Sequence, residues 1–278
     1  MRLLFAALLA LALAAPANSA PLPPDDAAGI NSFGEALLGL GESYRAATEF
    51  MRVLHHFPED RENSQRALTG LGRAYTMAGR WEEAAGVYSN LLKSEPSETN
   101  RHRLGATLYR AGRYNPAISI LSSDKSDAMR TLATLAWLKE GNFSEQPPNL
   151  DTRLIDEFKN LPQKSKTTAG VLSAVLPGAG HYYVDRPLDG TIALVVNGLF
   201  IWGTVNAAQN GREELAVTLG AIELIWYSGT ITGAVAGAAK WNHREKERFF
   251  SRHEQGAFPS WSIIPIRGGG ALAWTGRW

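Results

Sequence analysis

A unit of about 35 residues recurs between residues 30 and 145, and this repetition limits the fold more than any other feature of the chain. The clearest copy has the pair Leu71-Gly72, a turn glycine at Gly79 and a closing Pro96. The turn glycine recurs 38 residues earlier, at Gly41, and 33 residues later, at Gly112. Units of this length bury their apolar faces only against their neighbours. The pattern therefore predicts an all-α stack of antiparallel helix hairpins.

The order of small and aromatic residues in this copy resembles the tetratricopeptide repeat family. The matching positions are Leu71-Gly72, Tyr75, Gly79, Ala84, Tyr88 and Pro96, and the likeness extends over residues 30–145, where Trp137, Gly141 and Phe143 form a last half-unit. Most aromatic residues here are expected in the core. The resemblance also implies a concave groove for a protein partner. The candidate groove residues are Tyr44, Tyr75, Trp81, Tyr109 and Tyr114.

The first twenty residues have the pattern of an export signal. Arg2 precedes an apolar run from Leu3 to Ala15, and small residues end at Ala20. The run is too short to cross a bilayer of about 30 Å. We expect residues 1–20 to be a signal peptide and residues 21–29 a short lead segment before the repeats.

Residues 167–239 form a membrane region, separated from the repeats by a polar linker at residues 146–166. Thr191–Gly211 is uncharged, and Leu215–Ala239 contains one charge, at Glu223. Each run is long enough for a spanning helix. A further uncharged run, Thr167–Val184, is interrupted by Pro177-Gly178, so it is a poor third span, with an amphipathic or re-entrant segment as the alternative.

A second resemblance begins at this interruption. Pro177, Gly178, Gly180, His181 and Tyr183 are similar to the Pro-Gly-x-Gly-(Gln/His)-x-Tyr motif of a little-characterised prokaryotic membrane family with two spans. His181 stands where glutamine is common in that family. The aromatic-Asn pair Trp241-Asn242 after the second span is similar to the family's ending. The likeness implies a membrane location and no activity.

Two features of the spans are candidates for function. Gly229, Gly233 and Gly237 recur every four residues and form a stripe suited to close helix packing, on the first span or on a second copy. Glu223 is an acid within a span, and such residues are functional by default. The alternative is a neutral glutamic acid hydrogen-bonded to Asn197 or to a neighbouring chain.

Residues 240–278 combine a basic helix and a tail. The residues Trp261–Ile266, Gly268–Gly270 and Ala271–Trp278 have the pattern of a short β-hairpin. A cleaved signal would place the repeats outside the cell, and two spans would return the tail to that side. The basic residues after the second span favour a cytoplasmic tail instead. A third span would reconcile the two signals, but two spans are preferred.

The sequence contains no constellation typical of an enzyme. It has no cysteine and a net charge of +1, which argue against disulfides, thiolate metal sites and a nucleic-acid partner. We expect no cofactor, no metal and no catalytic residue. The leading hypothesis is an exported cell-envelope scaffold, in the inner membrane rather than the outer, whose periplasmic repeats bind a protein and whose hairpin anchors or oligomerises it. The alternative is an accessory subunit of a transport or export system that uses Glu223 and Asn197 in a polar path.

Overall fold

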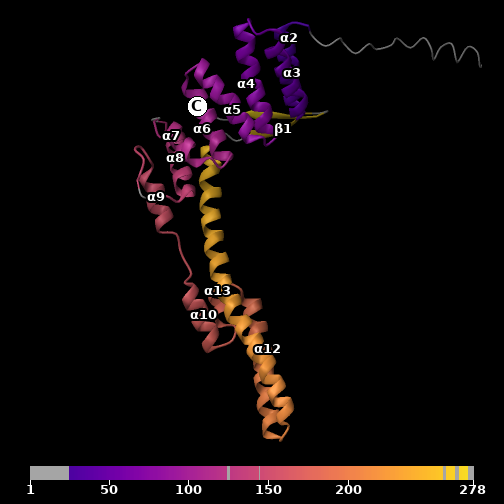
Figure 1. Cartoon of the computed structure of the whole chain (residues 1–278), viewed down its shortest axis with the longest axis vertical. Helices are drawn as coiled ribbons and strands as arrows, with labels where there is room; N and C mark the ends of the chain where they lie inside the picture. The colour runs from indigo at the N-terminus through magenta and orange to yellow at the C-terminus, as the bar shows by residue number, and fades with distance from the viewer. Residues whose placement is uncertain (1–24, 124–125, 144, 259–260, 267–268, 275–278) are drawn as a thin grey trace, which may run out of the picture. The chain divides into compact units, whose positions relative to one another are not determined.

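The computed structural model describes residues 25–123, 126–143, 145–258, 261–266 and 269–274 (Figure 1). The expected signal peptide, residues 1–20, and residues 21–24 of the lead segment lie outside the described residues. The chain divides into two compact units. One runs to Ile120 and includes the C-terminal strands, and the other is Leu121–Ser260.

In the described part of the first unit, the helices form three successive hairpins. They are α2 (Ala27–Gly39) with α3 (Ser43–His56), α4 (Arg61–Met77) with α5 (Trp81–Ser94), and α6 (Glu98–Arg110) with α7 (Tyr114–Leu121). Gly41, Gly79 and Gly112 have φ of 78°, 71° and 74°, the left-handed region that glycine adopts without strain. The N–H of the residue after each glycine donates to the carbonyl five residues earlier in the chain, for example from Glu42 to Leu37, as in a Schellman helix end. The turn positions predicted from the repeat are therefore the turns of the structure.

Glycine and aromatic side chains fit together between these hairpins. Phe50 of α3 is fully buried. A Cβ added at Gly34 would lie 2.8 Å from its ring, and one added at Gly70 would lie 2.3 Å from it. In the same way, a Cβ at Gly72 would lie 2.5 Å from the ring of Tyr88. The glycines are thus needed because the aromatic rings occupy the space of a side chain.

The second unit contains six helices. They are α8 (Asp127–Glu140), α9 (Thr152–Lys159), α10 (Lys166–Val175), α11 (Ala179–Tyr183), α12 (Pro187–Gln209) and α13 (Glu213–Ala257). The last half-unit expected among the repeats, at Trp137, therefore lies in this second unit. Likewise, the second apolar run and the basic helix after it are one continuous helix of 45 residues, α13.

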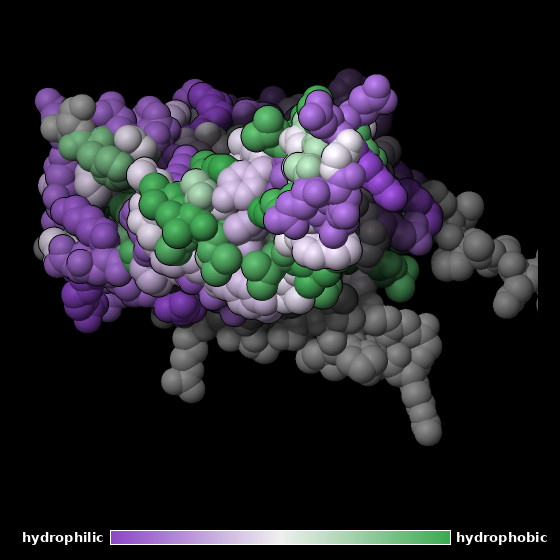
Figure 2. Space-filling model, turned by 90° about the horizontal axis from the view of Figure 1, so that it is seen from below, coloured by the Kyte–Doolittle hydropathy of each residue, from purple (hydrophilic) through white to green (hydrophobic). Residues whose placement is uncertain are grey.

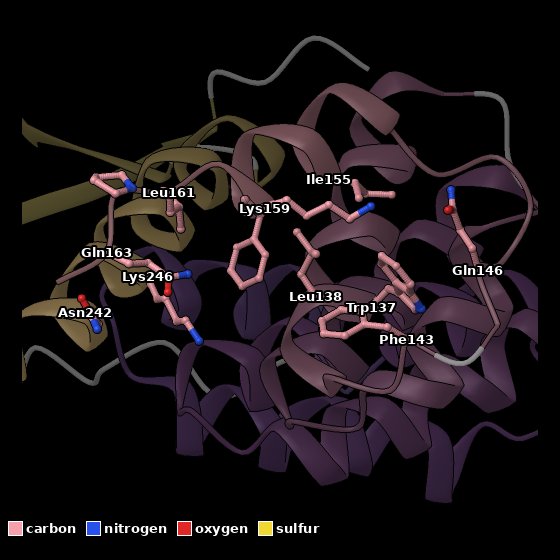
Figure 3. Close-up of a pocket in the computed structure, with 12 residues that line it drawn as sticks. Trp137, Leu138, Phe143, Gln146, Ile155, Lys159, Leu161, Gln163, Asn242 and Lys246 are labelled. Atoms are coloured by element: carbon pink, nitrogen blue, oxygen red, sulfur yellow. The ribbon is translucent and has the colours of Figure 1, made fainter. Parts of the chain in front are cut away.

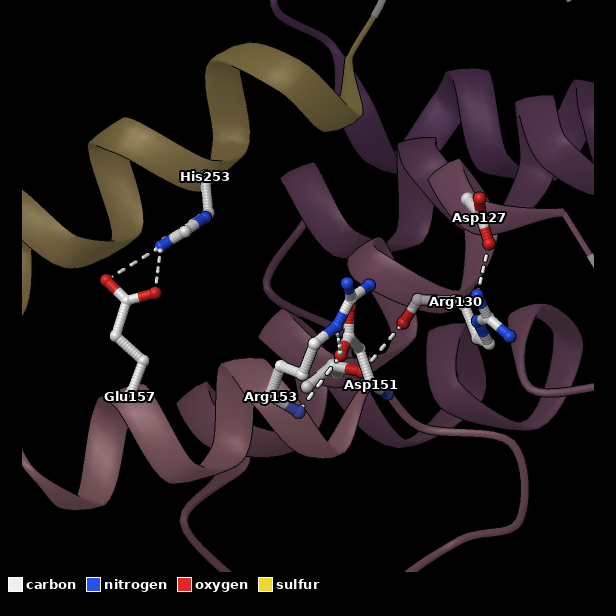
Figure 4. Close-up of polar contacts among 7 residues, drawn as sticks. Asp127, Arg130, Asp151, Arg153, Glu157 and His253 are labelled. Carbon is white, nitrogen blue, oxygen red and sulfur yellow. Dashed lines mark hydrogen bonds and ion pairs between the residues drawn. The ribbon is translucent and has the colours of Figure 1, made fainter.

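Helices α8 and α9 pack on the C-terminal part of α13. Phe158 meets Phe249 edge to face, with ring centroids 5.3 Å apart. Lys139 pairs with Glu254 at 2.7 Å, and Figure 4 shows Glu157 of α9 facing His253 of α13. We call α8, α9 and this part of α13 the α8–α9 layer.

Helices α12 and α13 are long and apolar enough to cross a membrane. In their most apolar 18-residue stretches only 17% and 11% of the residues are buried, unlike the core helices of a soluble protein. Large apolar side chains such as Leu199, Trp202 and Leu224 face outward, and Figure 2 shows hydrophobic residues exposed over this surface. By contrast, α10 is only 10 residues long and ends at Val175, before α11 begins at Ala179. The run Thr167–Val184 therefore forms no third helix long enough to cross a membrane.

The chain before α12 and the chain after the apolar part of α13 meet at one end of the hairpin. Lys164 contacts Asn242, and Glu157 contacts Arg252. If the hairpin crosses a membrane, an even number of crossings lies between these contacts.

Strands β1 (Trp261–Ile266) and β2 (Gly269–Trp274) pair antiparallel, with Trp261 opposite Trp274 and Ile266 opposite Gly269. The β-hairpin predicted in the tail is therefore present. Together with the helix-hairpin repeats and the two membrane-length helices, it confirms the predicted fold class.

Candidate functional site

The Pro-Gly-x-Gly motif forms a compact corner between α10 and α12. Gly178 has φ of 90°, and an added Cβ there would lie 2.2 Å from the carbonyl oxygen of Gly190. A Cβ at Gly180 would lie 2.0 Å from the carbonyl oxygen of Ala169 and 2.9 Å from the Ala234 side chain. Both glycines are required because backbone or packed side chains approach them from neighbouring helices. Pro177 comes directly after Leu176, the C-cap residue of α10, at a position where proline cannot continue the helix.

The two halves of the second resemblance meet around a linker residue, Lys164. We call Lys164, Tyr183, Asp185, Trp241 and Asn242 the Lys164 junction. The Lys164 N–H donates to Asn242 Oδ1 at 2.8 Å, and Asn242 Nδ2 donates to the Lys164 carbonyl at 2.9 Å. The Lys164 ammonium donates to the Tyr183 carbonyl and pairs with Asp185 at 3.1 Å. It also lies 5.0 Å from the centroid of the Trp241 ring, within reach of a cation–π interaction.

Asp185 is the charged partner of this junction. Its carboxylate accepts from Lys164 and, at 2.8 Å, from the Trp241 indole N–H. These hydrogen bonds, first the one from Lys164, hold the pKa of Asp185 below its usual value. Asp185 has φ of 58°, a conformation in which Asp and Asn are the best-tolerated side chains after glycine. The arrangement ties the linker, the end of α11 and α13 together at the point where α13 leaves its apolar stretch.

The glycine stripe of α13 has different neighbours along its length, and part of it faces α11. A Cβ at Gly233 would lie 3.2 Å from His181 Nε2, and one at Gly237 would lie 2.8 Å from Val184 Cγ2. Within the described residues, Gly229 has no neighbour within 4 Å of such a Cβ. Two of the three glycines therefore admit the α11 segment, and His181 is buried against them. Of the two expected partners of the stripe, the first span is not the neighbour found at Gly233 and Gly237, and packing on a second copy stays a prediction.

Glu223 and Asn197 are both buried but lie at different levels of the hairpin. The Asn197 amide donates to the Ala193 carbonyl and, at 3.4 Å, to Thr230 Oγ1. Thr230 is seven residues from Glu223, about 10 Å along α13. Both carboxyl oxygens of Glu223 are buried and have no hydrogen-bond partner among the described residues. The structure thus does not bring Glu223 to Asn197.

The expected groove residues of the repeats separate into two groups. Tyr44 is 64% exposed, and the hydroxyl of half-buried Tyr75 donates to Met51 Sδ at 3.9 Å. The Arg80 guanidinium lies 5.1 Å from the Tyr75 ring centroid. Tyr109, in contrast, is buried inside the unit with its ring edge to face on Tyr114, at 5.6 Å. Trp81 is half-buried.

The polar residues that organise the second unit were not evident from the sequence. Figure 4 shows Asp151 at the start of α9 with Arg153, and Asp127 with Arg130 on α8. Thr134 Oγ1 also accepts the Asp151 N–H at 2.8 Å, which ties the start of α9 to α8. Asp185 and Lys164 lie in turns and linkers, where no periodicity marks them. In the described part of the chain, no group of three or more His, Asp or Glu side chains is placed to hold a metal ion.

Comparison with known proteins does not assign the chain to a family. No protein-family model matches it, and no curated protein matches it. Among solved structures, "MamA RS-1 ArsTM double mutant" is similar, with 16% identity over 76% of this chain and 97% of that chain and a TM-score of 0.38. The fold itself defines the class, which is a helix-hairpin repeat protein with two helices of membrane length.

Proposed function

We propose that this protein is a non-enzymatic scaffold of the cell envelope, exported so that its repeats lie on the periplasmic side of the inner membrane. In this proposal the repeats hold a protein partner, and the α12–α13 hairpin anchors the chain in the membrane or joins it to further copies. The observation that carries the proposal is the exposed apolar surface of the hairpin. On a soluble protein, so many exposed apolar side chains would make the molecules associate with one another, whereas in a membrane lipid or another spanning helix would cover them.

The patch around Tyr44 supports a role in partner binding. Tyr44, Met51, Tyr75 and Arg80 bring together residue types enriched at protein interfaces, on neighbouring hairpins. Tyr and Arg are also the types that most often dominate binding energy. Arg80 is already ion-paired with Glu83, so its side chain is held in place before a partner arrives.

A site-specific photocrosslink tests partner binding. A photoreactive phenylalanine analogue at Tyr44, in the full chain in native membranes, is expected to give one discrete adduct that Arg80→Ala weakens. The matched control is the same analogue at Lys93, an exposed position of α5 outside the patch. Identical adducts at Tyr44 and Lys93, or none at Tyr44, would count against a partner at this surface.

Extraction from membranes tests the anchor separately. A hairpin that spans the membrane should keep the chain in the pellet at alkaline pH, when peripheral proteins are released. Release of the full chain under those conditions would exclude a spanning anchor, whatever the photocrosslink shows.

A second candidate, a transport accessory, is favoured by one observation only. The buried carboxyl of Glu223 has no hydrogen-bond partner in the described chain, and ionisable groups at such depths often mark transport pathways. This candidate predicts that Glu223→Gln abolishes an ion flux while the protein still inserts. The scaffold predicts no flux in either form and an unchanged crosslink at Tyr44.

A further inference from the structure

The α8–α9 layer contains a cavity that is apolar at one end and polar at the other. Its volume is about 350 Å³, within the range of small-molecule sites. Figure 3 shows Trp137, Leu138 and Phe143 close together at one end. Gln163, Asn242 and Lys246 lie together at the other end. The cavity is therefore shaped for a ligand with two chemically different ends.

The apolar end includes an aromatic ring that the described residues leave partly uncovered. Phe143 packs edge to face on Trp137, with ring centroids 4.9 Å apart, yet it is 54% exposed. Trp137 itself is buried, and its indole N–H is already satisfied by the Glu145 carbonyl at 3.2 Å. Since the two rings offer no unsatisfied donor, this end favours a hydrocarbon, which would also cover Phe143.

The charge of the lining is one-sided. Its twelve residues include Lys159 and Lys246 but no Asp or Glu. Among the described residues, neither lysine has a carboxylate within ion-pair distance. The Lys246 ammonium lies 5.9 Å from the ring centroid of Phe158, another lining residue, which places the charge at the cavity wall. At the end that Gln163, Asn242 and Lys246 share, a ligand with an anionic group would therefore meet Lys246 and no carboxylate of the lining.

The position of the cavity on α13 indicates where such a ligand comes from. Asn242 and Lys246 follow Lys240, the first charged residue after Glu223. At 1.5 Å per residue they lie about 3 and 9 Å beyond it along the helix. If the hairpin spans the membrane, as the proposed function holds, this is the level of lipid head groups.

We propose that this cavity binds one acyl chain with an anionic head group. The chain lies against Trp137, Leu138 and Phe143, and the head group lies at Lys246, beside Gln163 and Asn242. A peptide is a poorer occupant because its backbone would need hydrogen-bond partners that the apolar end lacks.

Tryptophan quenching by a brominated ligand tests the proposal. The full chain in non-ionic detergent is titrated with dodecanoate brominated at its methyl end. Because Trp202 and Trp226 are exposed on the apolar hairpin and would meet brominated chains in detergent or lipid, every arm uses a Trp202→Phe, Trp226→Phe background. In this background we expect saturable quenching that is lost on adding Trp137→Phe, because the bromine reaches only the apolar end. Lys246→Gln should weaken binding about tenfold, the effect of one charged hydrogen bond. Lys240→Gln, an exposed lysine of the same helix outside the cavity, should bind as the unmodified chain does.

Two further arms decide the head group and the source. The matched brominated dodecanol should bind more weakly than the acid. Nanodiscs of phosphatidylglycerol with brominated chains should quench Trp137 if the ligand is a bilayer lipid, whereas quenching by the free acid alone identifies a fatty acid. Quenching that persists in Trp137→Phe, equal binding of acid and alcohol, or no quenching in either arm would overturn the proposal. Flotation with liposomes is measured in parallel: a chain that floats without binding refutes the cavity ligand alone, and a chain that fails to float refutes the anchor.

Discussion

The main chain of Lys164 and the side chain of Asn242, 78 positions apart, exchange two hydrogen bonds of 2.8 and 2.9 Å. One asparagine amide thus satisfies both the N–H and the carbonyl of a residue that lies outside any helix. Asn242→Ala would leave these two half-buried groups without their partner, so we expect a loss of about 1–3 kcal/mol. Thermal unfolding of the purified full chain in detergent measures it. Asn210→Ala, at the α12–α13 turn, removes hydrogen bonds only within its own helix end and should be nearly neutral. Equal melting of the two variants would contradict the role of Asn242.

The Lys164 junction should also respond to acid. The folded-state pKa of Asp185 lies below its usual value of 3.8, chiefly because of its hydrogen bond from Lys164. The ionised Asp185 carboxylate therefore stabilises the folded protein fully at pH values above 3.8, and this stabilisation is lost as the pH falls through the lower folded-state pKa. Asp185→Asn tolerates the same positive φ but cannot ionise. The difference in melting temperature between the two proteins should be constant from pH 7 to about pH 5 and shrink below pH 3.8. A difference that shrinks already near pH 6 would show that another group is responsible.

Gly70 and Gly86 provide a matched pair in the repeats. A Cβ at Gly70 would lie 2.3 Å from the Phe50 ring, whereas at Gly86, within α5, it would meet no described atom within 4 Å. Gly70→Ala should cost about 1–3 kcal/mol by overpacking. Gly86→Ala should instead stabilise by about 0.5–1 kcal/mol through helix propensity. Denaturant unfolding measures both, and Phe50→Leu in the Gly70→Ala background should recover part of the loss. If Gly86→Ala lowered the free energy of unfolding as much as Gly70→Ala does, the loss at Gly70 could not be attributed to its contact with Phe50.

Replacing the glycines of the stripe by leucine should affect stability differently at the three positions. Gly237→Leu and Gly233→Leu would push against Val184 and His181, so both should lower the melting temperature of the hairpin and expose it to protease. Gly229→Leu meets open space and should leave this stability unchanged. If copies of the chain associate through the open part of the stripe, Gly229→Leu should abolish a cysteine-crosslinked dimer while the monomer remains inserted. Equal effects at all three positions would contradict the asymmetry of the packing.

The contacts across the hairpin predict its topology. Because Lys164 meets Asn242 and Glu157 meets Arg252, the repeats and the end of α13 should lie on one side of the membrane. The chain has no cysteine, so single substitutions can be labelled cleanly. An impermeant maleimide should label Lys93→Cys and Arg244→Cys from the same side, and Asn210→Cys from the other. In intact cells the proposed export predicts labelling at Lys93→Cys. Labelling of Lys93→Cys and Arg244→Cys from opposite sides would contradict the even number of crossings.

The sequence predicted the elements that depend on local chemistry. Gly41, Gly79 and Gly112 were identifiable because only glycine adopts the left-handed turn of the repeat without strain. The β-hairpin and the two apolar helices were also visible from their patterns.

The sequence did not predict features that depend on long-range contacts. Trp137 fits a repeat pattern by spacing, yet α8 packs in the second unit, where Lys139 pairs with Glu254 of α13. The junction was predicted only as two separate motif fragments. Lys164, which joins them, stands in a linker whose composition carries no signal for a contact 78 positions away.

The unbroken course of α13 has a mechanical consequence. Its 45 residues form a rod of about 68 Å. Near one end, Phe249 and Phe250 pack on Phe158 of α9, and nearer the middle, Gly233 and Gly237 pack on α11. A break in the helix between these two contacts would let the α8–α9 layer rotate independently of α11. Because α13 is continuous between these two contacts, a rotation of its C-terminal end about the helix axis would also turn Gly233 relative to His181.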